Sequence, residues 1–501
     1  MEPQVWEPCN YQLADCSTEH AVWIPDIPVL CDYESTEMAC FEETFVASSR
    51  RGQQLVQYAA TVTSKAAFCV FESKSQELDS ENKLWRDKMH RYPPSIRELG
   101  KQYTIPKIVS IGPYHHGLEH LKKAEEAKHV AAYSCIKHSG LELDEAVRKM
   151  YDAVVSVSGE ARSLYDTDTM ARIDDEKDFW PMMFYDACFL VQFMLRKTKK
   201  KSTIHPWLSS FFKCNKDDIY NDIMLLENQL PRVVIETLER FTPAVSLRSF
   251  ATLLRSILQN SHISKDLEAT SSAILYKQPH LLGYVRFIIV GTNKSERRQD
   301  PDKQPNNKVK SFSVGAIELA EMGIRLTPSE TPELAHMGFK EGHLSAELFM
   351  PHIALNCLNA SFLVNMAAFE ITSKPAGQKK EITSKLMSDH GEDTAVCSYI
   401  QLLGMFMDRE EDVRELRSKR ILQGGGGLAD KETLDFFTSL QGVSVTMGTL
   451  YHRTIDDVEI YKQNSWMCVK ANTFLYRHTK TMLTTFSVIA TLIGVYGALF
   501  K

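Results

Sequence analysis

Residues 221–231 read NDIMLLENQLP, a run in which three polar side chains follow an apolar stretch and precede a proline. The leucine pair can pack inward, while Glu227, Asn228 and Gln229 can satisfy buried backbone groups or cap a helix that restarts at Pro231. A carboxylate and two amides could equally form a ligand site. The packing role is favoured, because no metal-binding or nucleophile pattern accompanies these residues.

Helical signals dominate on both sides of this run. Residues 179–195 are apolar around most of the helical circumference, which predicts a helix at the centre of a core. Residues 222–240 also have a helical pattern, which Pro231 should kink or restart. Only residues 342–351 and 443–447 suggest short strands. The expected fold class is therefore mainly α, a large irregular helical domain with minor short β-strands.

Charge is distributed unevenly along the 501 residues, whose net charge is -6. No Lys or Arg precedes Arg50, whereas 10 Asp and Glu residues do. Residues 1–80, which are acidic and interrupted by prolines, are predicted to form a disordered extension. Residues 81–480 are expected to form the helical domain. Within that domain, residues 291–310 have almost no apolar content and predict a polar surface loop.

The last segment, residues 481–500, is a run without charged side chains. A helix of this length spans about 30 Å, the thickness of the hydrocarbon core of a bilayer, so the run predicts a C-terminal transmembrane helix. The alternative is a buried C-terminal helix of the domain. Arg477, His478 and Lys480 precede the run and Lys501 follows it. The positive-inside rule then predicts a single-pass membrane protein with a cytoplasmic body and the lipid bilayer as a partner.

The cysteines and lysines of the chain indicate its cellular compartment and the kinds of partner to expect. The 11 cysteines are spread singly, without a C-x-x-C pair, which favours reduced thiols in a cytosolic setting over a disulfide scaffold or a zinc module. A small basic cluster at Lys197 and residues 199–201 lacks interleaved aromatic residues. Nucleic acid is therefore not an expected partner, and no cofactor is expected.

One pattern suggests chemistry: His116, Glu119 and His120 fit H-x-x-E-H, in which two histidines hold zinc and the glutamate moves a proton. The spacing works only if all five residues are helical. Pro113 and Gly117 instead place His116 at the entrance of a helix, so a loop-to-helix junction is preferred. The sequence predicts no catalytic, cofactor-binding or metal-binding residues. A metal-dependent hydrolase that uses these three residues remains the alternative hypothesis.

Two segments are distinctive when taken together: residues 105–117, IPKIVSIGPYHHG, and residues 221–231. Shorter matches follow in order at residues 186–190, 280–282, 316–324, 365–370 and 411–413. With these segments the chain, from about residue 85 to its C-terminus, resembles the plant family catalogued as domain of unknown function 247 (DUF247).

The resemblance implies a mainly helical plant protein that ends in one transmembrane helix and has no established enzymatic activity. Some grass members of the family are associated with self-incompatibility loci, where a surface or signalling role is proposed. The function expected from the resemblance is therefore non-enzymatic: a membrane-anchored protein that recognises an as yet unknown protein partner in cell recognition or signalling.

Overall fold

The chain divides into two compact units, Met1–Ser73 and Lys74–Lys501. The computed structural model describes parts of the second unit only, namely residues 88–140, 142–198, 204–242, 246–260, 278–291, 314–342, 345–373, 394–424, 427–442, 447–464 and 466–499. The predicted N-terminal extension at 1–80, nearly all of the predicted loop at 291–310 and most of the predicted strand at 443–447 lie outside the described residues.

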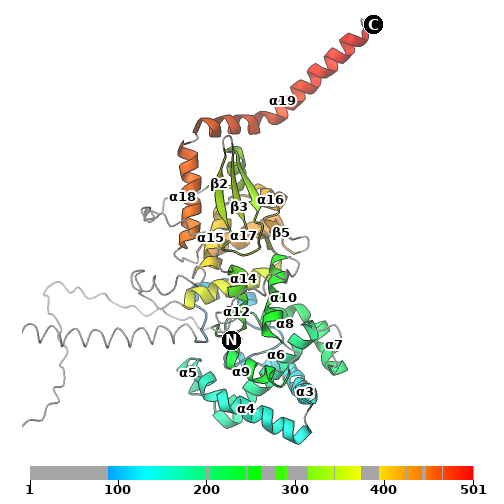
Figure 1. Cartoon of the computed structure of the whole chain (residues 1–501), viewed down its shortest axis with the longest axis vertical. Coiled ribbons are helices and arrows are strands. Elements are labelled where there is room, and N and C mark those ends of the chain that lie inside the picture. Colours follow the sequence, from blue (N-terminus) through cyan, green and yellow to red (C-terminus); the bar gives the residue numbers. More distant parts are fainter. Residues whose placement is uncertain are drawn as a thin grey trace, which may run out of the picture. The chain divides into compact units, whose positions relative to one another are not determined.

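Helix α6 (Trp180–Thr198) is the central element of the helical part (Figure 1). Nearly every side chain from Met182 to Leu195 is buried, as expected for a helix that is apolar on all sides. Among the described helices, those that pack against α6 include α3 (Lys122–His138), α4 (Leu143–Ser163), α9 (Arg232–Glu239) and α10 (Leu247–Gln259). The structure thus confirms the central core helix that the sequence predicts.

Pro231 restarts the helical chain rather than kinking a continuous helix. Helix α8 (Lys216–Asp222) ends nine residues before Pro231, and Pro231 is itself the extended N-cap residue of α9. Proline suits this place because its fixed φ and its missing N–H group do not disturb the first turn. The intervening segment is irregular, and Leu225 and Leu226 within it are buried.

Among the described residues, five short strands form two small sheets: β1 (Ile324–Pro328), β2 (Gly338–Glu341), β3 (Ala346–Met350), β4 (Ile353–Ala354) and β5 (Leu422–Gln423). The larger sheet has the order β1-β3-β2, in which β1 is parallel and β2 antiparallel to β3. Strands β4 and β5 pair in parallel. Strand β3 confirms the strand predicted at residues 342–351, whereas the sequence patterns did not predict the others.

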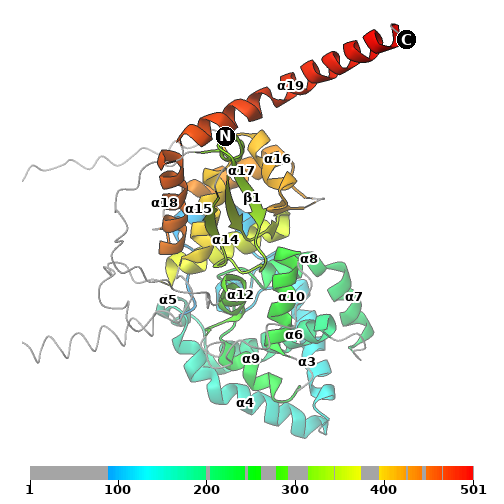
Figure 2. The same ribbon diagram turned by 45° about the horizontal axis from the view of Figure 1, so that its top comes forward.

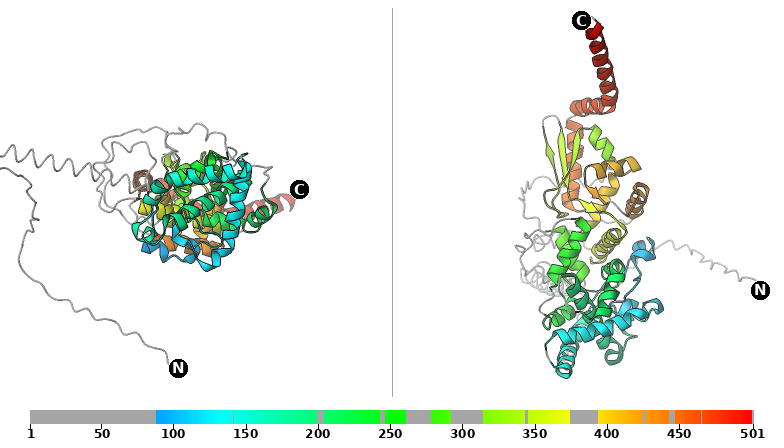
Figure 3. Two further views of the ribbon diagram at one scale, coloured as in Figure 1. Left: turned by 90° about the horizontal axis from the view of Figure 1, so that it is seen from below. Right: turned by 90° about the vertical axis from the view of Figure 1, so that its right-hand side faces the viewer.

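Helices pack around these sheets, and Figures 2 and 3 show them beside the strands. Helix α13 precedes β1 directly, α18 packs on β2, and α15 packs against α14 and α17. Their bounds are α12 (Leu281–Val290), α13 (Ala316–Glu321), α14 (Cys357–Thr372), α15 (Ala395–Met405), α16 (Glu410–Ser418), α17 (Asp430–Gln441) and α18 (Thr449–Asn464). Buried side chains from Met89 to Tyr461 form one hydrophobic cluster, so helices and sheets share a core.

The predicted transmembrane helix requires correction. Residues 481–499 belong to a longer helix, α19 (Trp466–Leu499), whose first half carries Lys470 and Arg477. Hydroxyl side chains such as Ser487 and Thr491 interrupt the apolar residues of its second half. Within the described ranges, no helix is both long and apolar enough to cross a membrane. The fold class is therefore mainly helical with short strands. The prediction of a C-terminal transmembrane helix is wrong.

Candidate functional site

Asp222 lies at the centre of a buried polar cluster. It is the last residue of α8, and its carboxylate accepts hydrogen bonds from the consecutive N–H groups of Lys107, Ile108 and Val109 at 2.9, 2.7 and 2.9 Å. Burial raises the pKa of Asp222, and the three backbone donors oppose that rise. One carboxylate thereby supplies hydrogen-bond acceptors to three backbone N–H groups of an irregular segment more than 100 residues earlier in the chain.

The two amides of the same run complete this role. Asn228 accepts from the N–H group of Ile111 at 2.6 Å and donates to the carbonyls of Val109 and Asp222. Gln229 accepts from the N–H group of Leu282, the first turn of α12, at 3.0 Å. Its amide nitrogen donates to two carbonyls of the irregular segment, those of Ile223 and Leu225, both at 2.8 Å. Oxygen and nitrogen of both amides are thus engaged with the backbone, as the packing role predicts.

Glu227 is the member of the cluster that pairs with exposed arginines. Its Oε1 atom accepts from the N–H group of Tyr92 at 2.7 Å and from the guanidinium of Arg97 at 3.0 Å. Arg91 lies 3.4 Å from the same oxygen and also stacks over the ring of Tyr114, 4.4 Å from its centroid. Both arginines are about half exposed, whereas the glutamate is almost fully buried. The carboxylate therefore anchors the first described segment to the cluster.

A buried ion pair ties α3 to α6. The ammonium group of Lys128 lies 2.6 Å from Asp186 and 2.7 Å from Glu125. Burial alone would lower the pKa of Lys128, but the two carboxylates raise it above its usual value. The second oxygen of Asp186 accepts from the N–H group of Gly112 at 2.8 Å.

Gly112 must be a glycine for two reasons. Its φ of +73° lies in the left-handed region. A Cβ atom there would also lie 2.9 Å from both the carbonyl oxygen of Gln229 and the hydroxyl of Tyr165, which themselves form a hydrogen bond of 2.9 Å. The glycine therefore allows the segment 105–117 to lie directly against the segment 221–231.

Two further acidic residues act in the same way near the sheets. The carboxylate of Glu370 on α14 accepts from the N–H groups of Val396 and Cys397 in the first turn of α15, at 3.0 and 2.9 Å. Asp412 on α16 accepts from the N–H group of Ile317 in the first turn of α13, at 3.0 Å. Each acid thus caps a helix that belongs to another part of the chain.

The H-x-x-E-H residues do not converge. His116 is extended, with φ of −60° and ψ of 140°, and only Glu119 and His120 enter a 3₁₀ turn. All three side chains are exposed. Glu119 pairs with Lys122 at 2.5 Å, and a ring nitrogen of His120 lies 2.9 Å from the carbonyl of Pro106. In the part of the chain that the structure covers, no three His, Cys, Asp or Glu residues are placed to hold a metal ion.

Buried histidines are the most perturbed bases near the cluster. Burial, followed by the charge of Arg91, lowers the pKa of His115 to about 4. Burial, followed by Lys88, lowers that of His90 to about 4. Burial, followed by the nearby His90, lowers the pKa of His280 to about 3. These three side chains are neutral near pH 7, and acid conditions disfavour the fold that buries them.

The segments that meet in this cluster lie within a region that matches a known protein family. A profile described as plant protein of unknown function, DUF247, matches residues 89–496. The chain belongs to the DUF247 family. A UPF0481 protein of Arabidopsis thaliana is 25% identical over 378 residues, which cover 70% of this chain and 71% of the relative. No solved structure matches the chain. The family resemblance predicted from the motif segments is thereby confirmed.

Three members of the cluster escaped the sequence analysis. Tyr92 accepts from the N–H group of Leu226 and donates to Asn365 at 2.5 Å, yet nothing in the sequence around Tyr92 indicates this. Asn365 and Asp186 both lie within segments that match the DUF247 family. Asn365 and Asp186 each stand among apolar neighbours in the sequence. A polar residue in such a place needs a hydrogen-bond partner elsewhere in the chain, and this pattern could have indicated their role.

We expect the replacement Asp222→Asn to destabilise the protein by about 3 kcal/mol, because an amide leaves at least one buried backbone N–H group without an acceptor. Urea denaturation measures the change in the free energy of unfolding. Asp217→Asn on the same helix is the matched control, since the Asp217 side chain is 74% exposed. Its expected effect is below about 0.5 kcal/mol. Equal losses from both variants would contradict the role assigned to Asp222.

A second prediction concerns acid stability. The unfolded chain protonates its histidines near pH 6.5, whereas folded His280 stays neutral to about pH 3, so stability falls as the pH falls through this window. Glu239, whose pKa burial raises to about 7, contributes with the opposite sign between about pH 7 and 4.5. A comparison of variants is therefore needed to isolate the contribution of one histidine.

His280→Asn provides that comparison, because asparagine can replace the His280 Nδ1 atom that accepts from Gly283 at the start of α12. The loss of unfolding free energy between pH 7 and pH 5 should be smaller by about 2 kcal/mol than in the unaltered chain. Exposed His116→Asn should leave that loss unchanged. An unaltered loss in the His280 variant would be inconsistent with a buried neutral imidazole.

Proposed function

We propose that this DUF247 protein acts by binding a partner protein, without a chemical step of its own, in recognition or signalling. The support is that its buried polar residues form hydrogen bonds to the backbone. The buried cluster holds the polar residues most suited to chemistry, but its carboxylates and amides are engaged in holding backbone segments together. The metal-dependent hydrolase alternative would need His116, Glu119 and His120 to meet, and their geometry gives it no support.

The observation that carries the proposal is the exposed apolar surface of α19. Large side chains there are each at least half exposed: Leu483, Phe486, Val488, Ile489, Leu492 and Ile493. Exposed apolar surface of this extent on one element marks an interaction site. The start of the helix is held by its own chain, because Arg477 binds Glu321 of α13 through two nitrogens at 2.7 and 3.0 Å.

The pattern along α19 favours a protein groove as the occupant. At helical spacing Phe486, Ile489 and Ile493 lie on one side, whereas Ser487 and Thr491 lie on another. The hydroxyl of Thr491 donates to the backbone carbonyl of Ser487 at 2.7 Å, so this side keeps a polar stripe. A helix with an apolar side and a polar stripe matches the way amphipathic helices enter a hydrophobic groove of a partner.

We propose a cytoplasmic location for the protein, on the basis of its thiols. The described cysteines are free: three are buried and two, Cys214 and Cys357, are exposed. Exposed free thiols persist in a reducing compartment. This supports the cytosolic setting that the cysteine spacing predicts.

Photo-crosslinking from the full chain in plant tissue tests the function. A benzophenone amino acid at position 492, on the apolar side, should give a discrete crosslinked protein, and the same group at position 491 should not. The variant Phe486→Ser with Ile493→Ser should remove the crosslink and leave the free energy of unfolding within about 0.5 kcal/mol, because both side chains are exposed. Crosslinks that survive this variant, that form equally from both positions, or that reach only lipid would contradict the proposal.

A further inference from the structure

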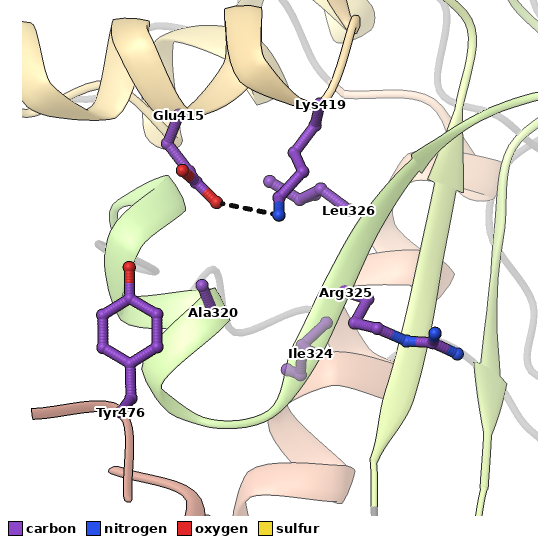
Figure 4. Close-up of a pocket in the computed structure, with 7 residues that line it drawn as sticks. All are labelled: Ala320, Ile324, Arg325, Leu326, Glu415, Lys419 and Tyr476. Atoms are coloured by element: carbon purple, nitrogen blue, oxygen red, sulfur yellow. Dashed lines mark ion pairs between the residues drawn. The ribbon is translucent and has the colours of Figure 1, made fainter. Parts of the chain in front are cut away.

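A depression of about 190 Å³ lies between β1, α16 and the start of α19, and Figure 4 shows its lining. The buried residues Ile324 and Leu326 form part of its wall. Lys419 pairs with Glu415 of the same helix at 3.3 Å, so these two charges neutralise each other. Small-molecule sites start at about 300 Å³. The depression is therefore too small for a whole ligand, and the exposed side chains of the surface are the better guide to a partner.

Basic side chains from three helices gather where α6 ends, beside α7 (Pro206–Cys214) and the start of α8. Figures 1 and 2 show α7 at the edge of the helical part, next to α8. The guanidinium of Arg196 donates from Nε to the hydroxyl of Ser209 on α7 at 3.2 Å. Lys213 lies one helical turn after Ser209 and is exposed. These side chains form what we call the basic surface: Arg196, Lys197, Lys213 and Lys216.

The basic surface has few counter-ions. Lys216 lies 3.3 Å from Asp217, an exposed neighbour on the same helix. The other three members form no ion pair with any described residue. The next acid of α8, Asp218, is engaged by Lys107 at 3.0 Å. Three further lysines, residues 199–201, follow α6 directly in the sequence but lie outside the described residues.

Lys197 shows that the positive charges crowd one another. Its ammonium group lies 5.1 Å from the ring centroids of both Phe193 and Tyr220, which hold it without a carboxylate. Burial, followed by the charges of Lys216 and Arg196, lowers the pKa of Lys197 to about 8. An anionic partner at this surface would relieve the repulsion.

An exposed indole accompanies the basic surface. Trp207, in the first turn of α7, is 40% exposed, and its ring stacks on that of Phe211 with 5.8 Å between centroids. The other aromatic side chains of α7 and α8, which are Phe211, Phe212 and Tyr220, are buried. An apolar ring with a polar N–H group suits the boundary between lipid head groups and acyl chains. Single-stranded nucleic acid is instead bound by stacking successive bases on several aromatic rings.

We propose that the basic surface and Trp207 bind the anionic surface of a lipid bilayer. The four cations lie against the negative lipid head groups, and the indole enters the interface beside them. Cytoplasmic leaflets carry such anionic lipids, in agreement with the cytoplasmic location proposed above. The contact is peripheral and needs no helix that crosses the bilayer. It uses other helices than the apolar surface of α19, so each of the two proposals can fail without the other.

Co-sedimentation of the full chain with vesicles tests the proposal. At low salt, vesicles of equimolar phosphatidylcholine and phosphatidylserine should bind the chain at least about tenfold more tightly than vesicles of phosphatidylcholine alone. High salt should remove this difference, because it screens the charges. Equal binding to both kinds of vesicle, or binding to neither, would overturn the proposal.

A pair of double variants locates the contact. Lys213→Gln with Lys216→Gln should weaken binding to the anionic vesicles about 20-fold, since each cation near such a bilayer contributes about fivefold. Arg148→Gln with Lys149→Gln removes the same charge from exposed positions on α4 and should weaken binding less than about twofold. Equal losses would show attraction by net charge alone and overturn the proposal.

The indole is tested in the same assay. Trp207→Ser should weaken binding to the anionic vesicles about tenfold, because membrane affinity grows with the apolar area that enters the interface. Tyr133→Ser on α3 is the control, since its ring is 52% exposed and lies on a helix without a member of the basic surface. Unchanged binding of the Trp207 variant, or an equal loss in both variants, would contradict the proposed contact.

A labelled single-stranded oligonucleotide represents the competing occupant. It should bind the chain more weakly than the anionic vesicles do at the same salt concentration. Tighter binding of the oligonucleotide, lost in the double lysine variant, would assign the basic surface to nucleic acid and overturn the proposal.

Discussion

Asp222 accepts hydrogen bonds from three consecutive backbone N–H groups that no helix or strand supplies with a partner. A buried amide without an acceptor costs about 1–3 kcal/mol, so a segment such as 107–109 can be buried only if some other part of the chain provides acceptors. The helix end at Asp222 and the irregular residues after it provide them. The segment 107–109 is thereby tied to α8, and the residues that follow it are tied to α3 through Ser110 and Lys128 and to α6 through Gly112 and Asp186.

Other parts of the DUF247 domain repeat this arrangement, in which an acidic side chain accepts hydrogen bonds from the backbone of a distant segment. Glu370 caps α15 and Asp412 caps α13, and in both cases the acid belongs to a different helix from the one that it caps. Asp186 accepts a backbone hydrogen bond and also forms a buried ion pair. The cost of removing its charge from water is offset by the ammonium group of Lys128 and by the N–H group of Gly112. The polar residues of the motif segments are therefore best understood as long-range partners for backbone groups, and the surfaces that could bind a partner lie elsewhere.

Much of this arrangement could be predicted from local pattern. The all-round apolarity of residues 179–195 predicted the central helix, and Pro231 predicted the restart at α9. The role of Asn228 and Gln229 followed from their chemistry, since amides among leucines must find partners. The partners themselves could not be predicted, because hydrogen bonds between residues more than 100 positions apart have no periodicity in one sequence.

The errors have physical causes as well. Strands β1 and β2 are four or five residues long, too short for an alternation to stand out from the helical background. The lack of charged side chains at residues 481–500 favours a membrane span. The hydroxyl residues of this run and the charged first half of α19 mattered more, because the described helix lacks the sustained apolarity of a membrane span.

Native-state hydrogen exchange tests most directly the claim that the motif residues hold the fold together. The amides of Ile108, Val109 and Ile111 lie in an irregular segment, and such segments ordinarily exchange by local opening. If their acceptors on Asp222 and Asn228 are as described, these amides should exchange as slowly as the core amides of α6, through global unfolding. Exchange at the rate of an exposed loop, while α6 remains protected, would contradict the account.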